Sequence, residues 1–195
     1  MCRRPRCVLD ASVYIDLNWA GIIPAFVLLP MEFIMVDLVR KEVRRPQEVP
    51  EARRITVCSL SGKQIAQVYE MRQQRWTSVL SLNDLLSFQL AKDEGCVLLA
   101  NDGALRAFAS SRGVTVHGSL WVLDEMLRHG LLTPSEAANA LEAMCSHGAR
   151  FPKKECDRRL REWRKQVKGG NEDGKEGDEQ ESRGDCLEAS AGRKD

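Results

Sequence analysis

Four acidic residues stand where an α/β protein places its functional side chains: Asp10, Glu42, Asp84 and Asp102. Asp10 ends the short apolar run 7–10, and Asp102 follows the apolar run 96–100. Ligands of open parallel sheets gather at the carboxyl ends of the strands. We therefore expect Asp10 and Asp102 at the ligand-binding edge. Asp84 precedes the almost unbroken apolar run 85–91, so we expect it near the interior of the domain.

Each of these acids, taken singly, also has a purely structural explanation. Asp10 and Asp102 fit as N-caps of the helices that follow them, a role that contributes about 1 kcal/mol. Asp84 lies three residues after Ser81 and fits a capping-box helix start. Glu42 fits as a solvated partner of the basic residues around it. We expect only structural roles for Asp37 and for Asp16, the latter on an exposed helix face.

Short apolar runs alternate with helical segments and predict the elements that position these acids. Strands are expected at 7–10, 32–36, 55–60, 96–100 and 114–117. Helices are expected at 11–21, 24–29, 38–43, 64–75, 81–93, 102–111, 120–129 and 133–144. The apolar strands lack alternation with polar residues, as expected when helices cover both faces of a sheet. The sequence thus predicts an α/β fold, a three-layer α/β/α sandwich with a mostly parallel sheet.

Four segments resemble the PIN domain in order and spacing: 8–16, 36–42, 82–84 and 98–106. The most specific are the first, a strand followed by Asp10, a small residue and Ser12, and the last, an apolar strand followed by Asn101-Asp102 and Leu105-Arg106. The resemblance covers about residues 5–145. It is closest to the toxin-type (VapC-like) members of the family.

This resemblance implies a metal-dependent endoribonuclease that hydrolyses phosphodiester bonds of single-stranded RNA. Asp10, Glu42, Asp84 and Asp102 would bind one or two Mg²⁺ or Mn²⁺ ions, with Ser12 and Asn101 in support. Ala100 stands where many relatives carry threonine. The resemblance further implies the toxin of a type II toxin–antitoxin pair, a homodimer restrained by a cognate antitoxin that blocks the acidic groove.

Elementary electrostatics agrees with this implied metal site. Two carboxylates about 4 Å apart repel by roughly 4 kcal/mol at an effective dielectric constant of about 20. A hard divalent cation relieves that repulsion, and a set of oxygen ligands suits Mg²⁺ or Mn²⁺ better than zinc. We expect Asp10 to be the central ligand and Asp102 to support the same site.

The net charge of +1 conceals an uneven distribution along the chain. Residues 1–152 carry 17 basic and 16 acidic residues, residues 153–168 carry 8 and 3, and residues 169–195 carry 4 and 9. We expect a PIN-like nuclease domain at 1–150, a basic helical extension at 151–168 and a disordered acidic tail at 169–195. The extension either binds RNA phosphates or is a solvated helix neutralised by the tail.

Cysteine usage and hydropathy favour a cytoplasmic protein without a membrane segment. The seven cysteines are odd in number and irregularly spaced, which suits a reducing compartment. The start of the chain lacks the apolar run of a secretory signal. The longest apolar stretch, 19–36, contains Glu32, two prolines and a glycine, unlike a membrane-spanning helix.

Other functions remain as alternatives to a toxin. A housekeeping RNA-processing nuclease is the nearest one, and a non-catalytic PIN-like module that binds RNA or protein is the next. A phosphoacceptor domain is disfavoured because the first strand lacks an acidic pair, and an Asp-x-Asp phosphatase because Asp10 is followed by Ala11-Ser12. Cys145, His147 and Cys156 match no common zinc module. The four tryptophans (19, 76, 121 and 163) are expected to pack rather than to stack on bases.

Overall fold

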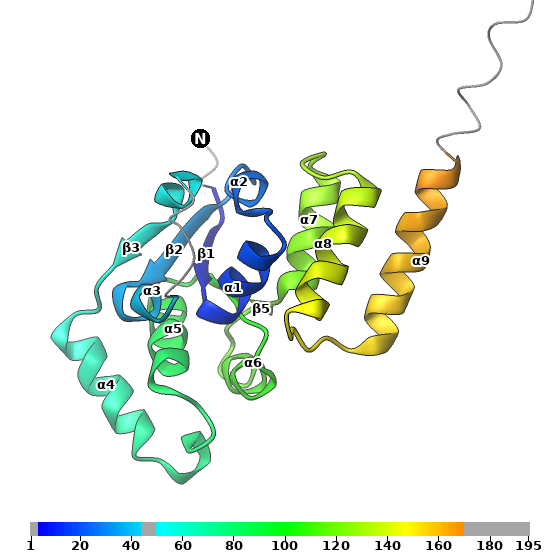
Figure 1. Ribbon diagram of the computed structural model, residues 1–195. Coiled ribbons are helices and arrows are strands. Elements are labelled where there is room, and N and C mark those ends of the chain that lie inside the picture. Colours follow the sequence, from blue (N-terminus) through cyan, green and yellow to red (C-terminus); the bar gives the residue numbers. More distant parts are fainter. Residues whose placement is uncertain (1–3, 44–49, 170–195) are drawn as a thin grey trace, which may run out of the picture.

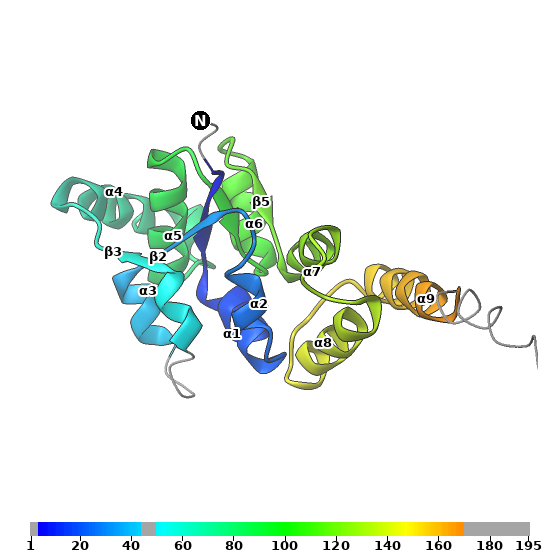
Figure 2. The same ribbon diagram turned by 90° about the horizontal axis from the view of Figure 1, so that it is seen from above.

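A computed structural model describes residues 4–43 and 50–169 (Figure 1). Its sheet has five strands: β1 (Arg6–Leu9), β2 (Glu32–Val36), β3 (Thr56–Cys58), β4 (Val97–Leu99) and β5 (Val116–His117). All neighbouring strands are parallel, in the order β3-β2-β1-β4-β5. Helices lie on both faces, with α4 and α5 on one side and α1, α2 and α7 on the other (Figure 2). The predicted α/β/α sandwich is therefore confirmed.

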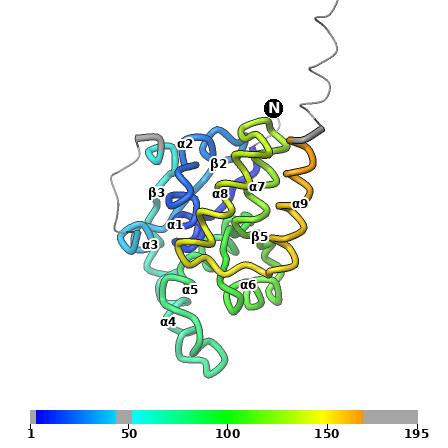
Figure 3. The backbone as a smooth tube through the Cα atoms, turned by 45° about the vertical axis from the view of Figure 1, so that its right-hand side comes forward, coloured from blue at the N-terminus to red at the C-terminus, as the bar shows by residue number. Residues whose placement is uncertain are grey.

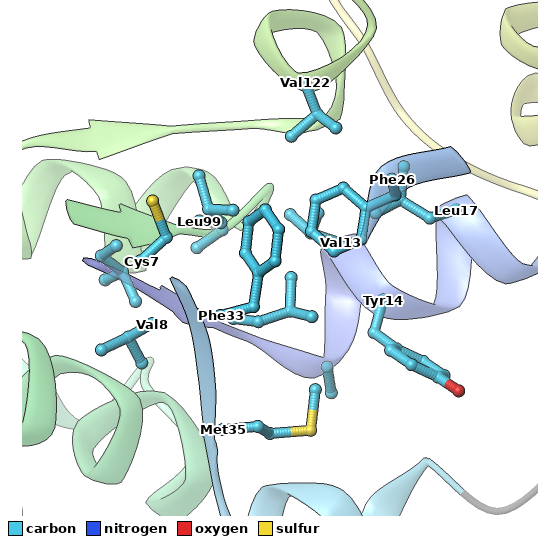
Figure 4. Packing of buried hydrophobic residues seen from close by; sticks show 14 of the residues in the cluster. Cys7, Val8, Val13, Tyr14, Leu17, Phe26, Phe33, Met35, Leu99 and Val122 are labelled. Carbon is cyan, nitrogen blue, oxygen red and sulfur yellow. The ribbon is translucent and has the colours of Figure 1, made fainter. Parts of the chain in front are cut away.

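The central strand β1 lies in the middle of the hydrophobic core. Cys7, Val8 and Leu9 are all buried, as expected for a parallel strand covered on both faces. Figure 4 shows Phe33 of β2 beside Phe26, whose ring centroid lies 4.0 Å from that of Phe33. Packing in the core therefore holds β1 between β2 and β4, and with it the position of Asp10, which directly follows β1.

The helices that surround the sheet are α1 (Ala11–Trp19), α2 (Ile23–Phe26), α3 (Asp37–Glu42), α4 (Gly62–Arg72), α5 (Leu82–Asp93), α6 (Gly103–Ser110), α7 (Ser119–Arg128), α8 (Pro134–Ser146) and α9 (Lys153–Gly169). Short 3-10 turns η1 (Pro50–Arg54) and η2 (Arg75–Thr77) join them. Capping boxes begin α4 at Ser61, α5 at Ser81 and α8 at Thr133. These caps set where three of the connections end.

Several expected boundaries differ from the structure. The strand expected at 55–60 contains only Thr56–Cys58, since β3 is a sheet edge whose Thr56 and Val57 are exposed. The helix expected at 24–29 is the single turn Ile23–Phe26. The helix expected at 64–75 begins earlier, at Gly62, because Ser61 caps it.

The basic segment after residue 152 forms α9, which packs beside α7 and α8 (Figure 3). Trp163 is only 4% exposed and joins the same hydrophobic cluster as the sheet, as does Cys156. Arg159 pairs with Asp124 of α7 at 2.6 Å, and Arg164 pairs with Glu142 of α8 at 2.5 Å. The expected acidic tail lies outside the described residues except for Gly169. None of the described helices combines the length and the hydropathy needed to cross a membrane.

Candidate active site at the carboxyl edge of the sheet

The strand order reverses between β1 and β4. From β1 the chain continues outward to β2 and β3, and it then returns to β4 and β5 on the other side of β1. Ligands of open α/β sheets bind at such a switch point, outside the carboxyl ends of the strands. Leu9 is in register with Leu99, and the Asp10 N–H donates to the Leu99 carbonyl at 3.0 Å. The residues after β1 therefore lie beside those after β4.

Asp10 is a buried acid held by hydroxyl groups. It is 4% exposed. One carboxylate oxygen accepts hydrogen bonds from the Ser12 N–H at 3.1 Å and the Ser12 hydroxyl at 2.7 Å, and the other accepts from the Ser87 hydroxyl at 3.2 Å. Burial raises the pKa of Asp10, although the hydrogen bonds from Ser12 and Ser87 oppose that rise. The expected N-cap role of Asp10 is confirmed.

Asp84 lies in the first turn of α5, and the charges of two other acids affect its pKa. Its carboxylate accepts from the Ser81 N–H at 2.7 Å and its own N–H donates to the Ser81 hydroxyl at 3.1 Å, so the expected capping box is present. Burial raises the pKa of Asp84, and the negative charges of Asp10 and Asp102 raise it further. Asp84 therefore lies close enough to Asp10 and Asp102 for their charges to shift its pKa.

Asp102 caps α6 and is exposed. Its Oδ1 accepts from the Leu105 N–H at 2.8 Å, which confirms the expected capping role. A carboxylate has two oxygens with about four lone-pair sites, so one capping bond leaves it able to accept further ligands. The structural and functional explanations of this acid are therefore compatible.

Glu42 reaches the same region through a neighbouring side chain. It is exposed at the end of α3, and Asn83 of α5 donates to its carboxylate at 2.6 Å. Asn83 precedes Asp84, so this bond ties α3 to the start of α5. Among the described residues Glu42 forms no ion pair, so it does not pair with Arg40 or Lys41. Arg44 and Arg45, the other basic residues beside it, lie outside that part of the chain.

Asp16 was expected on an exposed helix face, and this expectation is wrong. It is half-buried, and it accepts hydrogen bonds from Asn101 Nδ2 at 2.6 Å and the Ser119 hydroxyl at 3.1 Å. Burial raises the pKa of Asp16 to about 6. The sequence did contain a signal, because Ser12 and Asp16 are four residues apart and therefore share one face of a helix.

Asn101 links this acid to the end of β4. Its backbone N–H donates to the Ser12 hydroxyl at 3.1 Å, and its Oδ1 accepts from the Ser119 N–H at 2.9 Å. Gly118 permits this close approach, since a Cβ there would lie 2.7 Å from the Asn101 Oδ1. Asn101, expected only as a supporting residue, therefore connects Ser12, Asp16 and Ser119 in one hydrogen-bonded network.

The acids at this edge offer only oxygen donors to a metal ion. Within residues 4–43 and 50–169, no three His, Cys, Asp or Glu side chains are already close enough to hold a cation together. The donor set itself suits Mg²⁺ or Mn²⁺, which prefer carboxylate oxygens. A bound cation would also stabilise the ionised carboxylates of Asp10 and Asp84, whose pKa values are raised by burial. The residues present therefore fit a hard divalent cation in chemistry.

Among the described residues, Cys145, His147 and Cys156 do not gather as a metal site. Cys145 and Cys156 share a hydrogen bond, but the His147 ring stacks on Trp19 with centroids 4.3 Å apart. The tryptophans differ from the expectation in part: Trp163 is buried, whereas Trp19 is 48% and Trp76 50% exposed. Both exposed rings still stack on a neighbour, Trp76 on Phe108.

Comparison with known families places these observations in context. The sequence model of a family described as a PIN domain matches residues 6–165. The chain therefore belongs to the PIN-domain family, whose fold is of the nuclease type and whose members are generally nucleases. The match extends through most of α9, beyond the 5–145 expected from the motifs. No curated protein matches the sequence.

Proposed function

We propose that the protein is a metal-dependent endoribonuclease that acts on single-stranded RNA. The observation that carries the proposal is the placement of Asp10 after β1 and Asp102 after β4, at the switch point of the sheet, where the charges of both raise the pKa of Asp84. Within the described part of the chain, no basic side chain pairs with any of the three. Gathered like charges without a cationic partner are what a divalent cation stabilises.

Asp10, Asp84 and Asp102, with Glu42 at the rim, are the residues that would hold Mg²⁺ or Mn²⁺. Such an ion supplies positive charge to the reacting phosphodiester and eases deprotonation of the attacking water. The chain's own contribution is to position the acids. Ser12 and Ser87 hold both oxygens of Asp10, and their hydrogen bonds favour its ionised form against the effect of burial.

The hydrogen-bonded network around Asn101 would position the edge from the β4 side. Asn101 and Ser119 hold Asp16, and the Asn101 N–H donates to the hydroxyl that orients Asp10. A change at Asp16 would therefore reach Asp10 through Asn101 and Ser12. We assign these residues to positioning and the four acids to the ion.

Cleavage of a single-stranded RNA tests the proposal. The wild-type protein is expected to cut in Mn²⁺ or Mg²⁺ and to stop when EDTA is added. Asp10→Asn is expected to abolish cleavage while its circular dichroism spectrum stays that of the wild type. Cleavage that continues in EDTA, or a fully active Asp10→Asn variant, contradicts the proposal. Binding of RNA without any cleavage supports the alternative of a non-catalytic module.

The biological role we propose is that of a toxin in a toxin–antitoxin pair, with a homodimer and a cognate antitoxin as partners. The motifs at 8–16 and 98–106 support it by their resemblance to toxin-type PIN domains. Induced expression of the wild type alone is expected to arrest the growth of a bacterial host, and expression of Asp10→Asn is not. Growth that continues with an enzyme active in vitro favours a housekeeping RNA-processing nuclease.

A further inference from the structure

A cavity of about 500 Å³ adjoins the acidic edge. Asn101 and Gly103, the two neighbours of Asp102, form part of its lining. Residues 150–152, the last part of the connection between α8 and α9, also line the cavity. Its volume lies within the roughly 300–1,000 Å³ range of sites that hold small organic groups. The cavity is thus large enough for a nucleotide unit and lies next to a proposed catalytic acid.

One wall of this cavity is aromatic. Trp121 and His117 both line it, and their rings stack with centroids 4.2 Å apart and planes 10° apart. Phe151 and Leu120 add further apolar surface. Nucleobases stack on such rings whatever their identity, because every base has a π face. The wall therefore suits a base.

Three arginines line the cavity, and two of them form no ion pair with an acid among the described residues. Arg159 is held by Asp124 and Glu155 at 2.6 and 2.7 Å. Arg106 donates only to the Ala100 carbonyl, at 3.0 Å, and exposed Arg150 has no carboxylate partner within the described part of the chain. Unpaired guanidinium groups are well suited to phosphate oxygens.

We propose that this cavity is an RNA subsite that takes one nucleotide next to the scissile phosphate, with the base against Trp121 and a flanking phosphate at Arg106 and Arg150. The inference rests on the proposed function and assigns where its substrate binds. It also assigns a role to the packing of α9, which adjoins the 150–152 part of the cavity lining. Buried Trp163 and the ion pair of Arg159 with Asp124 hold α9 against the domain, and the N–H groups of Glu155 and Cys156 in α9 donate to the Pro152 carbonyl at 2.9 and 3.2 Å.

The phosphate half of the proposal is tested by equilibrium binding. A labelled single-stranded oligoribonucleotide is titrated with Asp10→Asn protein in Mg²⁺, so that no cleavage intervenes. Adding Arg150→Ala is expected to weaken binding about 5- to 10-fold and to flatten the salt dependence by roughly 0.7 in log–log slope. The matched control is Arg54→Ala, an exposed arginine before β3, at the opposite edge of the sheet. Equal binding by the two variants overturns the assignment of Arg150.

Stacking of a base on Trp121 is tested by combining a protein variant that lacks the ring with oligonucleotides that each lack one base. Trp121→Leu is expected to weaken binding about 5- to 100-fold. Its matched control is Trp19→Leu, since Trp19 also stacks on a histidine but lies outside the cavity. Each base of the oligonucleotide is removed in turn. At one position the loss of binding caused by the missing base and the loss caused by Trp121→Leu should not add. Additive losses at every position overturn base stacking on Trp121.

The subsite and the proposed function fail in distinguishable ways. Arg150 is exposed, so Arg150→Ala is expected to fold normally even if Trp121→Leu does not. In wild-type background, Arg150→Ala should raise KM for cleavage with little change in kcat. Metal-dependent cleavage with unchanged binding in both cavity variants overturns the subsite alone. The absence of metal-dependent cleavage by the wild type overturns the proposed function, and the subsite with it.

Discussion

The carboxyl edge of the sheet and helix α9 are both rich in charge, yet they use it in opposite ways. At the edge, the negative charges of Asp10 and Asp102 raise the pKa of Asp84, and none of the three acids has an ion-pair partner among the described residues. On α9, Arg158 pairs with Glu155 and Glu162 of the same helix, and Arg159 also pairs with α7. Unpaired like charges indicate a ligand, whereas paired opposite charges indicate packing.

This difference adds to what charge counts alone suggest. The sequence makes 153–168 the most basic segment and therefore a candidate for binding RNA. In the structure three of its basic side chains, those of Arg158, Arg159 and Arg164, form ion pairs, and Trp163 is buried. The near-neutral part of the chain contains Asp10, Asp84 and Asp102, together with the two cavity arginines, Arg106 and Arg150, that form no ion pair among the described residues.

Asp84→Asn and Asp102→Asn are each expected to lower kcat/KM for RNA cleavage at least about 1,000-fold, or roughly 4 kcal/mol, because each removes a carboxylate from the proposed cation site. Asparagine retains an oxygen that accepts the capping hydrogen bond, so the helix starts should persist. Asp37→Asn is the control, since Asp37 follows β2 but holds Leu38 and Ser59 instead. Similar losses in all three variants would contradict the contrast.

Trp163→Ala is expected to lower the free energy of unfolding by about 3 kcal/mol, because it removes a large buried side chain. Urea unfolding at equilibrium measures the change. Val167→Ala, on the same helix but 39% exposed, should cost less than about 0.5 kcal/mol. If both variants unfold like the wild type, α9 does not contribute its packing to the domain.

Ser12→Ala is expected to reduce kcat/KM about 10- to 100-fold, since it removes the hydroxyl that orients Asp10 and accepts from the Asn101 N–H. Steady-state cleavage rates measure this loss. Ser59→Ala removes a hydroxyl that donates to Asp37 at the same distance, 2.7 Å, and should have no effect on cleavage. A loss in Ser59→Ala as large as in Ser12→Ala would show that the loss is not specific to Asp10.

Asp16→Asn should show the smallest effect, and one that depends on pH. Burial raises the pKa of Asp16 to about 6, so the folded protein retains this proton while the unfolded chain has lost it. The Asp16 contribution to stability therefore falls as pH rises from about 4 to about 6. Across that range the free energy of unfolding of Asp16→Asn should rise by about 1 kcal/mol relative to that of the wild type. This is less than the energy equivalent of the whole pKa shift, because Asp16 is only half-buried. A difference that does not vary with pH in urea unfolding contradicts this assignment.

The sequence predicted most elements because they depend on local patterns, whereas the four acids were selected as a set by their resemblance to PIN-domain motifs. Apolar runs without alternation indicate buried strands, and Ser81 with Asp84 is a local cap signal. It did not predict the order of the strands, which depends on which strand each crossover reaches. The role of Asp16 was missed because its partners, Asn101 and Ser119, are 85 and 103 residues away. The cavity beside Asp102 depends equally on distant segments.

Titration of the protein with Mn²⁺, followed by electron paramagnetic resonance, tests the central claim most directly. The claim is that Asp10 and the acids beside it form a cation site at the switch point between β1 and β4. Wild type and Asp37→Asn are expected to bind Mn²⁺ equally, and Asp10→Asn should bind it at least about tenfold more weakly. Equal binding by all three proteins, or no binding by the wild type, would contradict the claim.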